Sequence, residues 1–266
     1  MNPTLAQITK ELLATYGRHP RKRLGQHFLV DPQVVQRILM AAELTKKDHV
    51  LEIGTGLGIL TKELADHVQK VTTVEVDKEL LKIAKEVLKD YANIEFIHGD
   101  FLKMDLSSFC PEGNYKVVGN LPYYITAPIM EKILKTKIKP QLAVLMLQKE
   151  VAERMAASPG TKKYGSFSIF VQYHAEVKID SFVSKSSFYP WPEVSSAIIV
   201  LKPYSTPKYE VKNEKLFFDL VHTAFQQRRK KLKNSLAEFN LENKGIDLSR
   251  RPEELSLEEF ARLANQ

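Results

Sequence analysis

The stretch VLEIGTGLGILT, Val50–Thr61, decides the fold of this chain. Its apolar start predicts a strand, and the amphipathic residues from Ile59 onward predict a helix. The Gly-x-Gly-x-Gly run between them lets the backbone turn sharply and approach a ligand, and the helix N-terminus offers free N–H groups. A dinucleotide-binding loop would have its third glycine at the position of Ile59. The stretch therefore predicts a ligand-binding strand–loop–helix unit of a different kind.

Strand and helix patterns alternate from Val50 to Leu147, which predicts a Rossmann-like parallel sheet with helices on both faces. Ligands bind such sheets outside the carboxyl ends of the strands. Two apolar runs, 166–179 and 195–202, predict further strands that form an antiparallel edge. Beyond a proline-containing linker the pattern becomes helical. We expect an α/β domain at 1–203 and a small helical domain at 204–266.

Acidic side chains stand at the ends of the first three predicted strands. Glu52 precedes the glycine run, and this acid-strand-GxGxG form resembles motif I of S-adenosylmethionine (SAM) methyltransferases, which places Gly54 and Gly56 against SAM. Glu75 lies about 20 residues beyond the loop, where a carboxylate grips a ribose diol. Asp100 ends the third strand and could accept a hydrogen bond from the adenine amine of SAM. The alternative is that each acid is a solvated strand end or a helix cap, which is the role we expect for Asp77.

The fourth strand, YKVVG, leads into Asn120-Leu121-Pro122-Tyr123. The Asn120 amide oxygen and the Leu121 carbonyl, held rigid by Pro122, can each accept one N–H of an exocyclic amine. Tyr123 can stack on the ring of a flipped-out base. The sequence thus predicts a site for an adenine, with an ordinary strand-to-loop turn as the alternative.

Composition sets the class of the protein. The chain has 266 residues, a net charge of +7 and a pI of about 9.2, which permits a polyanionic partner. A single cysteine, Cys110, excludes an intramolecular disulfide and a cysteine-rich zinc site and fits the cytosol. The sequence shows neither a signal peptide nor an apolar run of membrane-spanning length. We expect a cytoplasmic protein with no membrane contact.

Basic residues gather in two places that could bind RNA phosphates. The first holds Arg21, Lys22 and Arg23, and the second, the densest, runs from Arg228 to Lys233. A basic stripe is the electrostatic mark of phosphate binding, and Arg228, Arg229 and Lys230 are its candidate residues. The alternative for such a charge run is a solvated helix face.

The sequence as a whole resembles the rRNA adenine N6,N6-dimethyltransferase family of the KsgA type. The resemblance covers nearly the whole chain and rests on a small set of motifs: RKRLGQHFL, EIGTGLG, NLPYYI, LQKEVAERM with YGSFSIFVQ, FYPWPEVSSA and AFQQRRKKLKNSL. It implies that Gln26, His27 and Leu29 contact SAM and that Phe188 stacks on the target base. The residues alone would make His27 a loop residue and Phe188 a core residue.

The resemblance implies SAM-dependent N6,N6-dimethylation of adenosines, two adjacent ones near the 3′ end, in the small-subunit 16S rRNA of a maturing particle. It implies a SAM-binding catalytic methyltransferase domain and a C-terminal RNA-binding domain. The sulfonium methyl of SAM is already activated, so we expect no metal, and we expect a monomer. The alternatives are a large-subunit rRNA adenine methyltransferase of the macrolide-resistance type and a non-catalytic assembly factor. Three positions depart from the commoner pattern: Thr55, Tyr124 and Ser195.

Overall fold

The computed structural model describes residues 3–106, 109, 114–239 and 245–265. Cys110 lies outside the described residues. The helices are α1 (Leu5–Thr15), α2 (Pro32–Ala41), α3 (Ile59–Ala65), α4 (Lys78–Val87), α5 (Thr126–Lys135), α6 (Lys149–Met155), α7 (Ser166–His174), α8 (Glu214–Gln226), α9 (Leu232–Ser235) and α10 (Leu257–Ala264). The strands are β1 (Phe28–Leu29), β2 (His49–Ile53), β3 (Lys70–Glu75), β4 (Ile94–His98), β5 (Tyr115–Asn120), β6 (Leu142–Gln148), β7 (Ala175–Val183), β8 (Phe188–Tyr189) and β9 (Ser196–Pro203).

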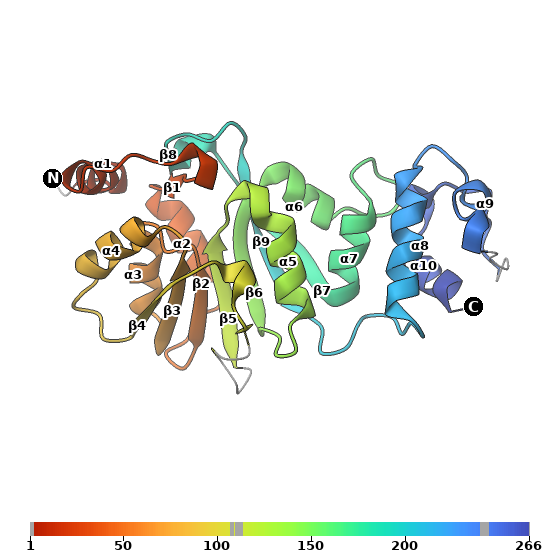
Figure 1. Cartoon of the computed structure of the whole chain (residues 1–266), viewed down its shortest axis with the longest axis horizontal. Coiled ribbons are helices and arrows are strands. Elements are labelled where there is room, and N and C mark those ends of the chain that lie inside the picture. Colours follow the sequence, from red (N-terminus) through yellow and green to blue (C-terminus); the bar gives the residue numbers. More distant parts are fainter. Residues whose placement is uncertain (1–2, 107–108, 110–113, 240–244, 266) are drawn as a thin grey trace. The chain divides into compact units, whose positions relative to one another are not determined.

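A seven-stranded sheet in the order β4-β3-β2-β5-β6-β9-β7 forms the centre of the fold (Figure 1). Strands β4, β3, β2, β5 and β6 are parallel, and β9 runs antiparallel to β6. The order reverses at β2, where β3 and β5 lie on opposite sides of it, and a ligand site is expected beside such a reversal. The predicted Rossmann-like α/β fold is confirmed.

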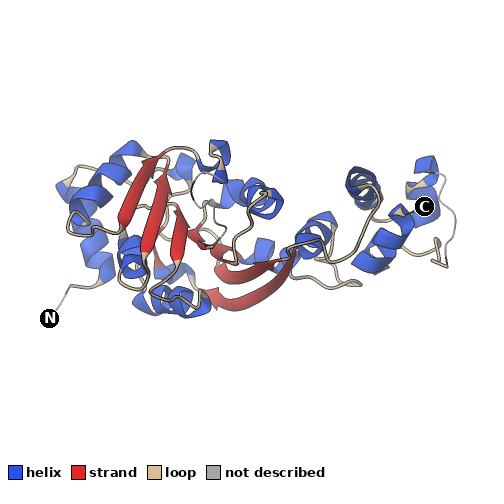
Figure 2. Ribbon diagram, turned by 90° about the horizontal axis from the view of Figure 1, so that it is seen from below, coloured by secondary structure: helices blue, strands red, loops and turns tan. Residues whose placement is uncertain are grey.

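Helices cover both faces of the parallel strands (Figure 2), and β3, β2, β5 and β6 are mostly buried, whereas the edge strand β4 is partly exposed. Several helices begin at a side chain that binds their free N–H groups. Asp77 accepts from Glu79 N at the start of α4, as expected, and Asp31 accepts from Gln33 N at the start of α2. These caps fix where each chain segment turns from strand to helix, and so fix the loops at the carboxyl edge of the sheet.

The run 166–179, expected to be a strand, is a helix over its first half: α7 spans Ser166–His174, and only then does β7 begin. The prediction rested on β-branched and aromatic residues, which favour strands but are overruled by packing. Ile169 and Tyr173, spaced four residues apart, both lie in a buried cluster with Phe217 and Leu220 of α8. The helical spacing puts both side chains on one face, and that face is buried.

The chain forms two compact units, residues 1–149 with 178–203, and residues 150–177 with 204–266. The second unit begins its last part at Tyr204, next to the expected boundary after residue 203, but it also includes residues 150–177. The cause is the cluster just described, in which Tyr164, Ile169 and Tyr173 pack with residues of α8 and α10. The second unit therefore combines α7 with the C-terminal helices.

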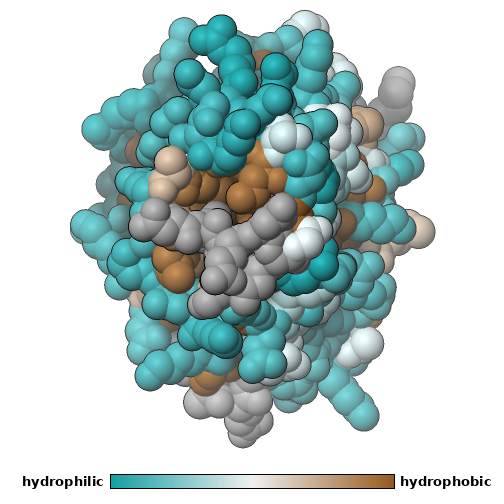
Figure 3. Space-filling view, turned by 90° about the vertical axis from the view of Figure 1, so that its right-hand side faces the viewer, coloured by the Kyte–Doolittle hydropathy of each residue, from teal (hydrophilic) through white to brown (hydrophobic). Residues whose placement is uncertain are grey.

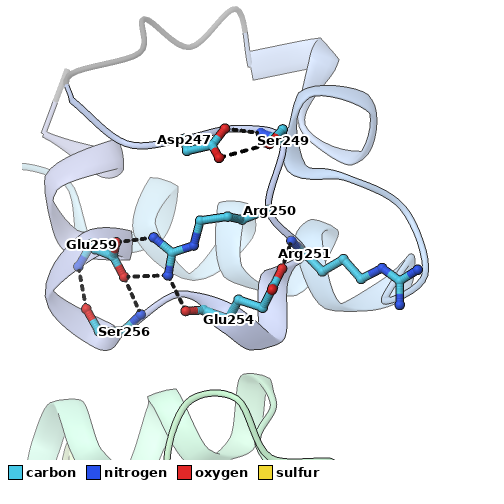
Figure 4. A network of polar contacts seen from close by, with 7 residues as sticks. All are labelled: Asp247, Ser249, Arg250, Arg251, Glu254, Ser256 and Glu259. Carbon is cyan, nitrogen blue, oxygen red and sulfur yellow. Dashed lines mark hydrogen bonds and ion pairs between the residues drawn. The ribbon is translucent and has the colours of Figure 1, made fainter.

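Polar contacts fasten the end of the second unit. Arg250 donates to both carboxylate oxygens of Glu259 and to the carbonyl of Glu254 (Figure 4). Glu259 and Ser256 form a capping box at the start of α10, with Ser256 N donating to Glu259 Oε2 over 2.8 Å and Glu259 N to Ser256 Oγ over 3.2 Å.

The side of the molecule seen in Figure 3 is mostly hydrophilic, with hydrophobic residues gathered near its middle. Among the described residues, no helix combines the length and hydropathy needed to cross a bilayer.

Candidate active site

The glycine loop between β2 and α3 requires its glycines. Gly54, Gly56 and Gly58 have φ angles of +88°, +56° and +84°, a region that other residues rarely adopt. A Cβ on Gly58 would lie 2.8 Å from Leu88 Cδ1, so this residue also lets the loop approach α4. The loop thereby stays low over the strand ends and leaves room above it for a ligand.

Glu52 anchors this loop from beneath. It is fully buried, and its Oε2 accepts hydrogen bonds from the hydroxyls of Thr61 and Thr73, each over 2.6 Å. Thr55 Oγ1 lies 2.7 Å from Thr73 Oγ1 and extends the chain of hydroxyls into the loop. Burial raises the pKa of Glu52 to about 8, against the opposing effect of the two hydroxyl donors. Glu52 thus holds the loop as a largely neutral hydrogen-bonded group.

Glu75 and Asp100, the two acids predicted to bind SAM, both face the ligand space. Glu75 accepts from the N–H of Gly56 and from the N–H of Asp77, both over 2.9 Å. Burial raises the pKa of Glu75, while these backbone donors oppose the shift. Asp100 is half-buried, and its Oδ1 accepts from Leu102 N over 3.0 Å. Each carboxylate keeps lone pairs for further donors, because an ionised carboxylate offers about four acceptor positions.

Asn120 ends β5 with its amide held in one orientation. Its Nδ2 donates to the carbonyl oxygen of His27 over 3.0 Å, so Oδ1 is the amide atom that can accept from a substrate. The Leu121 N–H donates to Met146 O over 2.9 Å, which fixes the peptide between Asn120 and Leu121, directly before the peptide that carries the Leu121 carbonyl. A Cβ on Gly119 would lie 2.8 Å from Ile53 O, so a glycine at this position lets β5 lie close against β2.

Tyr123 follows in a 3₁₀ turn that begins after Pro122. Its hydroxyl lies 2.7 Å from Ser196 Oγ, and its ring stacks on that of His27 with 6.0 Å between centroids. Burial raises the pKa of Tyr123, so the phenol is neutral near neutral pH. The His27 Nδ1 is 2.8 Å from Pro190 O. Three segments distant in sequence therefore meet around these two rings.

The N-terminal segment is tied to the start of α4. Gln26 Nε2 donates to Asp77 Oδ2 over 3.0 Å, and its Oε1 accepts from Arg21 N over 2.8 Å. The Arg21 guanidinium lies 3.2 Å from the same Asp77 carboxylate, which is 4 % exposed. Arg21, predicted to bind RNA, is thus engaged in holding its own segment, whereas Lys22 and Arg23 are exposed.

These segments enclose a cavity of about 260 Å³ at the carboxyl edge of the sheet. The sequence-predicted residues that line it come from the N-terminal segment and from the ends of the first four strands of the sheet: Gln26, His27, Leu29, Gly54, Gly56, Glu75, Asp100, Asn120, Leu121, Pro122 and Tyr123. Among the described residues, no three His, Cys, Asp or Glu side chains gather as metal ligands would.

Phe188 does not line this cavity. It is 1 % exposed and belongs to the core cluster of the first unit, with Leu29 and Val35 among its members. The cause is the short antiparallel pair of β1 and β8, which sets Phe188 opposite Leu29. The base-stacking role that the family resemblance implied for Phe188 stays a prediction, and Tyr123 is the aromatic residue of the predicted pair that lines the cavity.

Sequence reasoning missed the apolar part of the lining. Val76, Phe101 and Leu102 line the cavity, and each stands directly after one of the acids Glu75 and Asp100 or one position further on. Apolar surfaces at these positions can hold a flat base between them, next to a carboxylate that binds its polar edge. The sequence could have predicted these lining residues, because a residue directly after a strand-end acid lies at the same edge of the sheet as the acid.

The basic segment from Arg228 to Lys233 lies in the second unit. Arg228 Nη2 donates to the carbonyls of Lys162 and Tyr164, over 2.9 and 3.1 Å. These bonds bring the lysine-bearing loop 158–165 beside the basic segment. Arg229 and Lys230 are exposed.

Comparisons with known proteins show the family of the chain. The chain is 44% identical to the ribosomal RNA small subunit methyltransferase A of Clostridium botulinum (strain Loch Maree / Type A3), over 97% of each protein. The identity to that of Bacillus pumilus is also 44%, over 97% of this chain and 94% of the relative.

Among solved structures, a dimethyladenosine transferase from Plasmodium falciparum matches with a TM-score of 0.77 and 28% identity, over 89% of this chain and 96% of that one. The 23S rRNA methyltransferase ErmE matches with a TM-score of 0.71 and 29% identity, over 90% of this chain and 100% of that one. The family model described as ribosomal RNA adenine dimethylase matches residues 17–266. The chain therefore belongs to the ribosomal RNA adenine dimethylase family.

Proposed function

We propose that the cavity binds SAM and that Asn120 and Leu121 present an adenosine amine to it. The single observation that carries the proposal is the hydrogen bond from Asn120 Nδ2 to the carbonyl of His27. It turns the amide oxygen into the acceptor at the end of β5, next to the carbonyl of Leu121. Two acceptors on adjacent residues match the two N–H groups of one exocyclic amine.

The donor and acceptor groups of the lining fit SAM. Glu75 would accept from the ribose hydroxyls, as expected for a carboxylate at the second strand end. Asp100 would accept from the adenine amine, while Val76, Phe101 and Leu102 hold the ring. Gly54 and Gly56 leave space for the amino-acid part of SAM. When bound, SAM supplies a methyl group already activated on a sulfonium.

The chain's own residues would supply orientation rather than acid–base chemistry. The lone pair of an adenine amine is delocalised into the ring, which makes the nitrogen a poor nucleophile. Hydrogen bonds to the Asn120 oxygen and the Leu121 carbonyl favour a pyramidal nitrogen, with its lone pair directed away from the ring. Tyr123 stacks on the base and fixes its plane, and such orientation can supply much of the rate. The released proton passes to water.

The substrate we assign is small-subunit rRNA in a maturing particle, with two adjacent adenosines near its 3′ end as the targets. The relatives that are 44% identical carry the small-subunit name, whereas the 23S rRNA enzyme is 29% identical. Lys22, Arg23, Arg229 and Lys230 are the exposed cations that we assign to RNA phosphates. We propose that the protein acts as a monomer in the cytoplasm.

Methylation of isolated particles tests the proposal. The protein is incubated with SAM and with small-subunit precursor particles or large-subunit particles, and the nucleosides are resolved by mass. N6,N6-dimethyladenosine in the small-subunit RNA alone is the expected result. Transfer only to the large-subunit RNA would favour the macrolide-resistance type of enzyme. Binding of particles without any transfer would favour an assembly factor.

A further inference from the structure

Three large aromatic side chains of the first unit are more than half exposed. Trp191 is 72 % exposed, Tyr124 58 % and Phe182 57 %. Tyr124 lines the cavity itself, and its ring would contact a Cβ on Gly25 at 3.6 Å. Trp191 is the only tryptophan of the chain and does not belong to the lining. A tryptophan this exposed contributes little to the stability of the fold through burial, so we ask which ligand its ring could contact.

The segment that carries Trp191 is tied to the cavity wall at both ends. On one side, the carbonyl of Pro190 lies 2.8 Å from His27 Nδ1. On the other, Ser196 Oγ lies 2.7 Å from the Tyr123 hydroxyl. His27 and Tyr123 stack on each other and both line the cavity. Trp191 follows Pro190 directly, so it is one residue away from the carbonyl that contacts His27 of the cavity lining.

Cations lie beside the Phe182 ring and beside the segment that carries Trp191. Lys149 Nζ lies 4.8 Å from the centroid of the Phe182 ring, and its backbone N–H donates to Ser195 O. Lys185 donates to the main-chain carbonyl of Glu193, two residues after Trp191. Exposed rings with ammonium groups close by are the features with which proteins bind single-stranded nucleic acid, since every base can stack and every phosphate can pair.

We propose that Trp191 is a stacking platform for the base that neighbours the target adenosine in single-stranded RNA. The inference rests on the proposed function, since it places the RNA strand by its target base. Extruding one base from a strand unstacks its neighbour, and a ring at the rim offers that neighbour a new partner. Trp191 thereby sets the direction in which the strand crosses the rim, while Tyr123 holds the target base inside.

The fluorescence of the single tryptophan reports on this contact directly. A short single-stranded oligoribonucleotide with adjacent adenosines is titrated into the SAM-loaded protein, and its binding is followed separately by the anisotropy of a label on the RNA. Quenching of the Trp191 emission along the same binding curve is expected. Oligonucleotides with an abasic site on the 5′ or the 3′ side of the target identify the stacked neighbour, since quenching is lost with one of them. Binding without quenching, or quenching that survives both abasic sites, would overturn the proposal.

Variants separate the platform from a general loss of structure. Trp191→Ala loses one stacked base, so it should bind RNA about 5-fold to 150-fold more weakly than the parent. Its affinity for SAM should be unchanged, and Trp191→Phe should restore RNA binding. Met40→Ala, which removes a 78 % exposed apolar side chain from α2, is the matched control and should bind RNA like the parent. Equal RNA affinity of Trp191→Ala and the parent would refute the platform while leaving the proposed function intact. A parent that neither binds this RNA nor methylates small-subunit precursor particles would refute both.

Discussion

The cavity wall and the basic segment Arg228–Lys233 both offer polar side chains to a ligand, but they hold them in opposite ways. In the wall, Glu75 and Asn120 are each fixed by hydrogen bonds to backbone atoms of neighbouring segments. In the basic segment, Arg229 and Lys230 are exposed on the surface. Side chains in a fixed orientation suit a small ligand that must bind in one pose. Solvent-exposed cations suit a charged polymer that binds at the surface.

Arg228 shows that the two kinds of residue can stand side by side. Arg228 is exposed like its neighbour Arg229, but its Nη2 donates to the loop carbonyls of Lys162 and Tyr164, so its side chain is held against the protein. A charge run in the sequence therefore cannot be assigned to RNA binding as a block. If wall and surface differ as this geometry requires, substitutions in them should have separable effects.

The largest effect is expected at Asn120. Asn120→Ala removes an acceptor whose contact with the amine matters most in the transition state, so turnover should fall about 10²-fold to 10³-fold. SAM affinity, measured by calorimetry, should fall only modestly. Single-turnover rates with SAM and RNA in excess give the measurement. A variant that keeps more than about a tenth of the parent rate, a difference of about 1.4 kcal/mol, would rule out the assigned role.

Glu75→Gln and Asp100→Asn should act on the cofactor instead. Each leaves the shape of the side chain and removes a charged acceptor, which weakens binding by about 1.5–3 kcal/mol. Calorimetric titration with SAM in the absence of RNA measures the loss. Asp90→Asn, at an exposed acid beyond α4, is the matched control and should bind SAM normally. If both strand-end variants match the control, the acids serve only the fold.

Glu52 should make stability depend on pH. Its pKa of about 8 in the folded protein exceeds its ordinary value of 4.5, so the folded state binds the extra proton across that window. The free energy of unfolding should therefore fall as pH rises from 4.5 to about 8, by at most about 1.4 kcal/mol per pH unit. Denaturant unfolding of the parent and of Glu52→Gln at several pH values measures the slope. The variant stays neutral and should lack this contribution; identical slopes would mean that Glu52 is ionised in the fold.

The smallest effect per residue is expected on the surface. Arg229→Glu and Lys230→Glu should each weaken RNA binding by about three-fold at moderate salt and reduce the salt dependence by nearly one unit of slope. SAM affinity should not change. Arg262→Glu, an exposed arginine on α10, controls for net charge.

Arg228→Ala should instead loosen the loop 158–165, which would be measured as faster amide hydrogen exchange in that loop. If Arg228→Ala changes only RNA binding, as Arg229→Glu should, then Arg228 does not hold the loop.

The position of the strand-end acids could be predicted because parallel strands align their carboxyl ends. Once β2, β3 and β4 were placed in the sequence, Glu75 and Asp100 had to meet at one edge, and they do. The same logic confirmed Asp77 as the cap of α4. The family itself was also predicted correctly, because its motifs stand at these strand ends.

The other placements depended on contacts between distant segments. The run 166–174 was expected to be a strand, and its packing with α8 and α10 favours a helix instead. Phe188 is buried, as its residue type alone suggested, and its partner Leu29 lies far away in the sequence. The engagement of Arg21 with Asp77 joins residues whose side chains could equally have faced water. Local sequence specified which groups were present, and tertiary packing decided where they were directed.

The bond from Asn120 reaches the main chain of His27 and not its imidazole. The orientation of the amide is therefore insensitive to what side chain stands at position 27, but it depends on the number of residues between Gly25 and Phe28. Removing one residue there would shift the register of β1 against β8 and carry a different carbonyl, or none, to Asn120. A one-residue deletion in this segment should thus lower activity more than any substitution of His27, because the number of residues in the segment determines which carbonyl reaches Asn120.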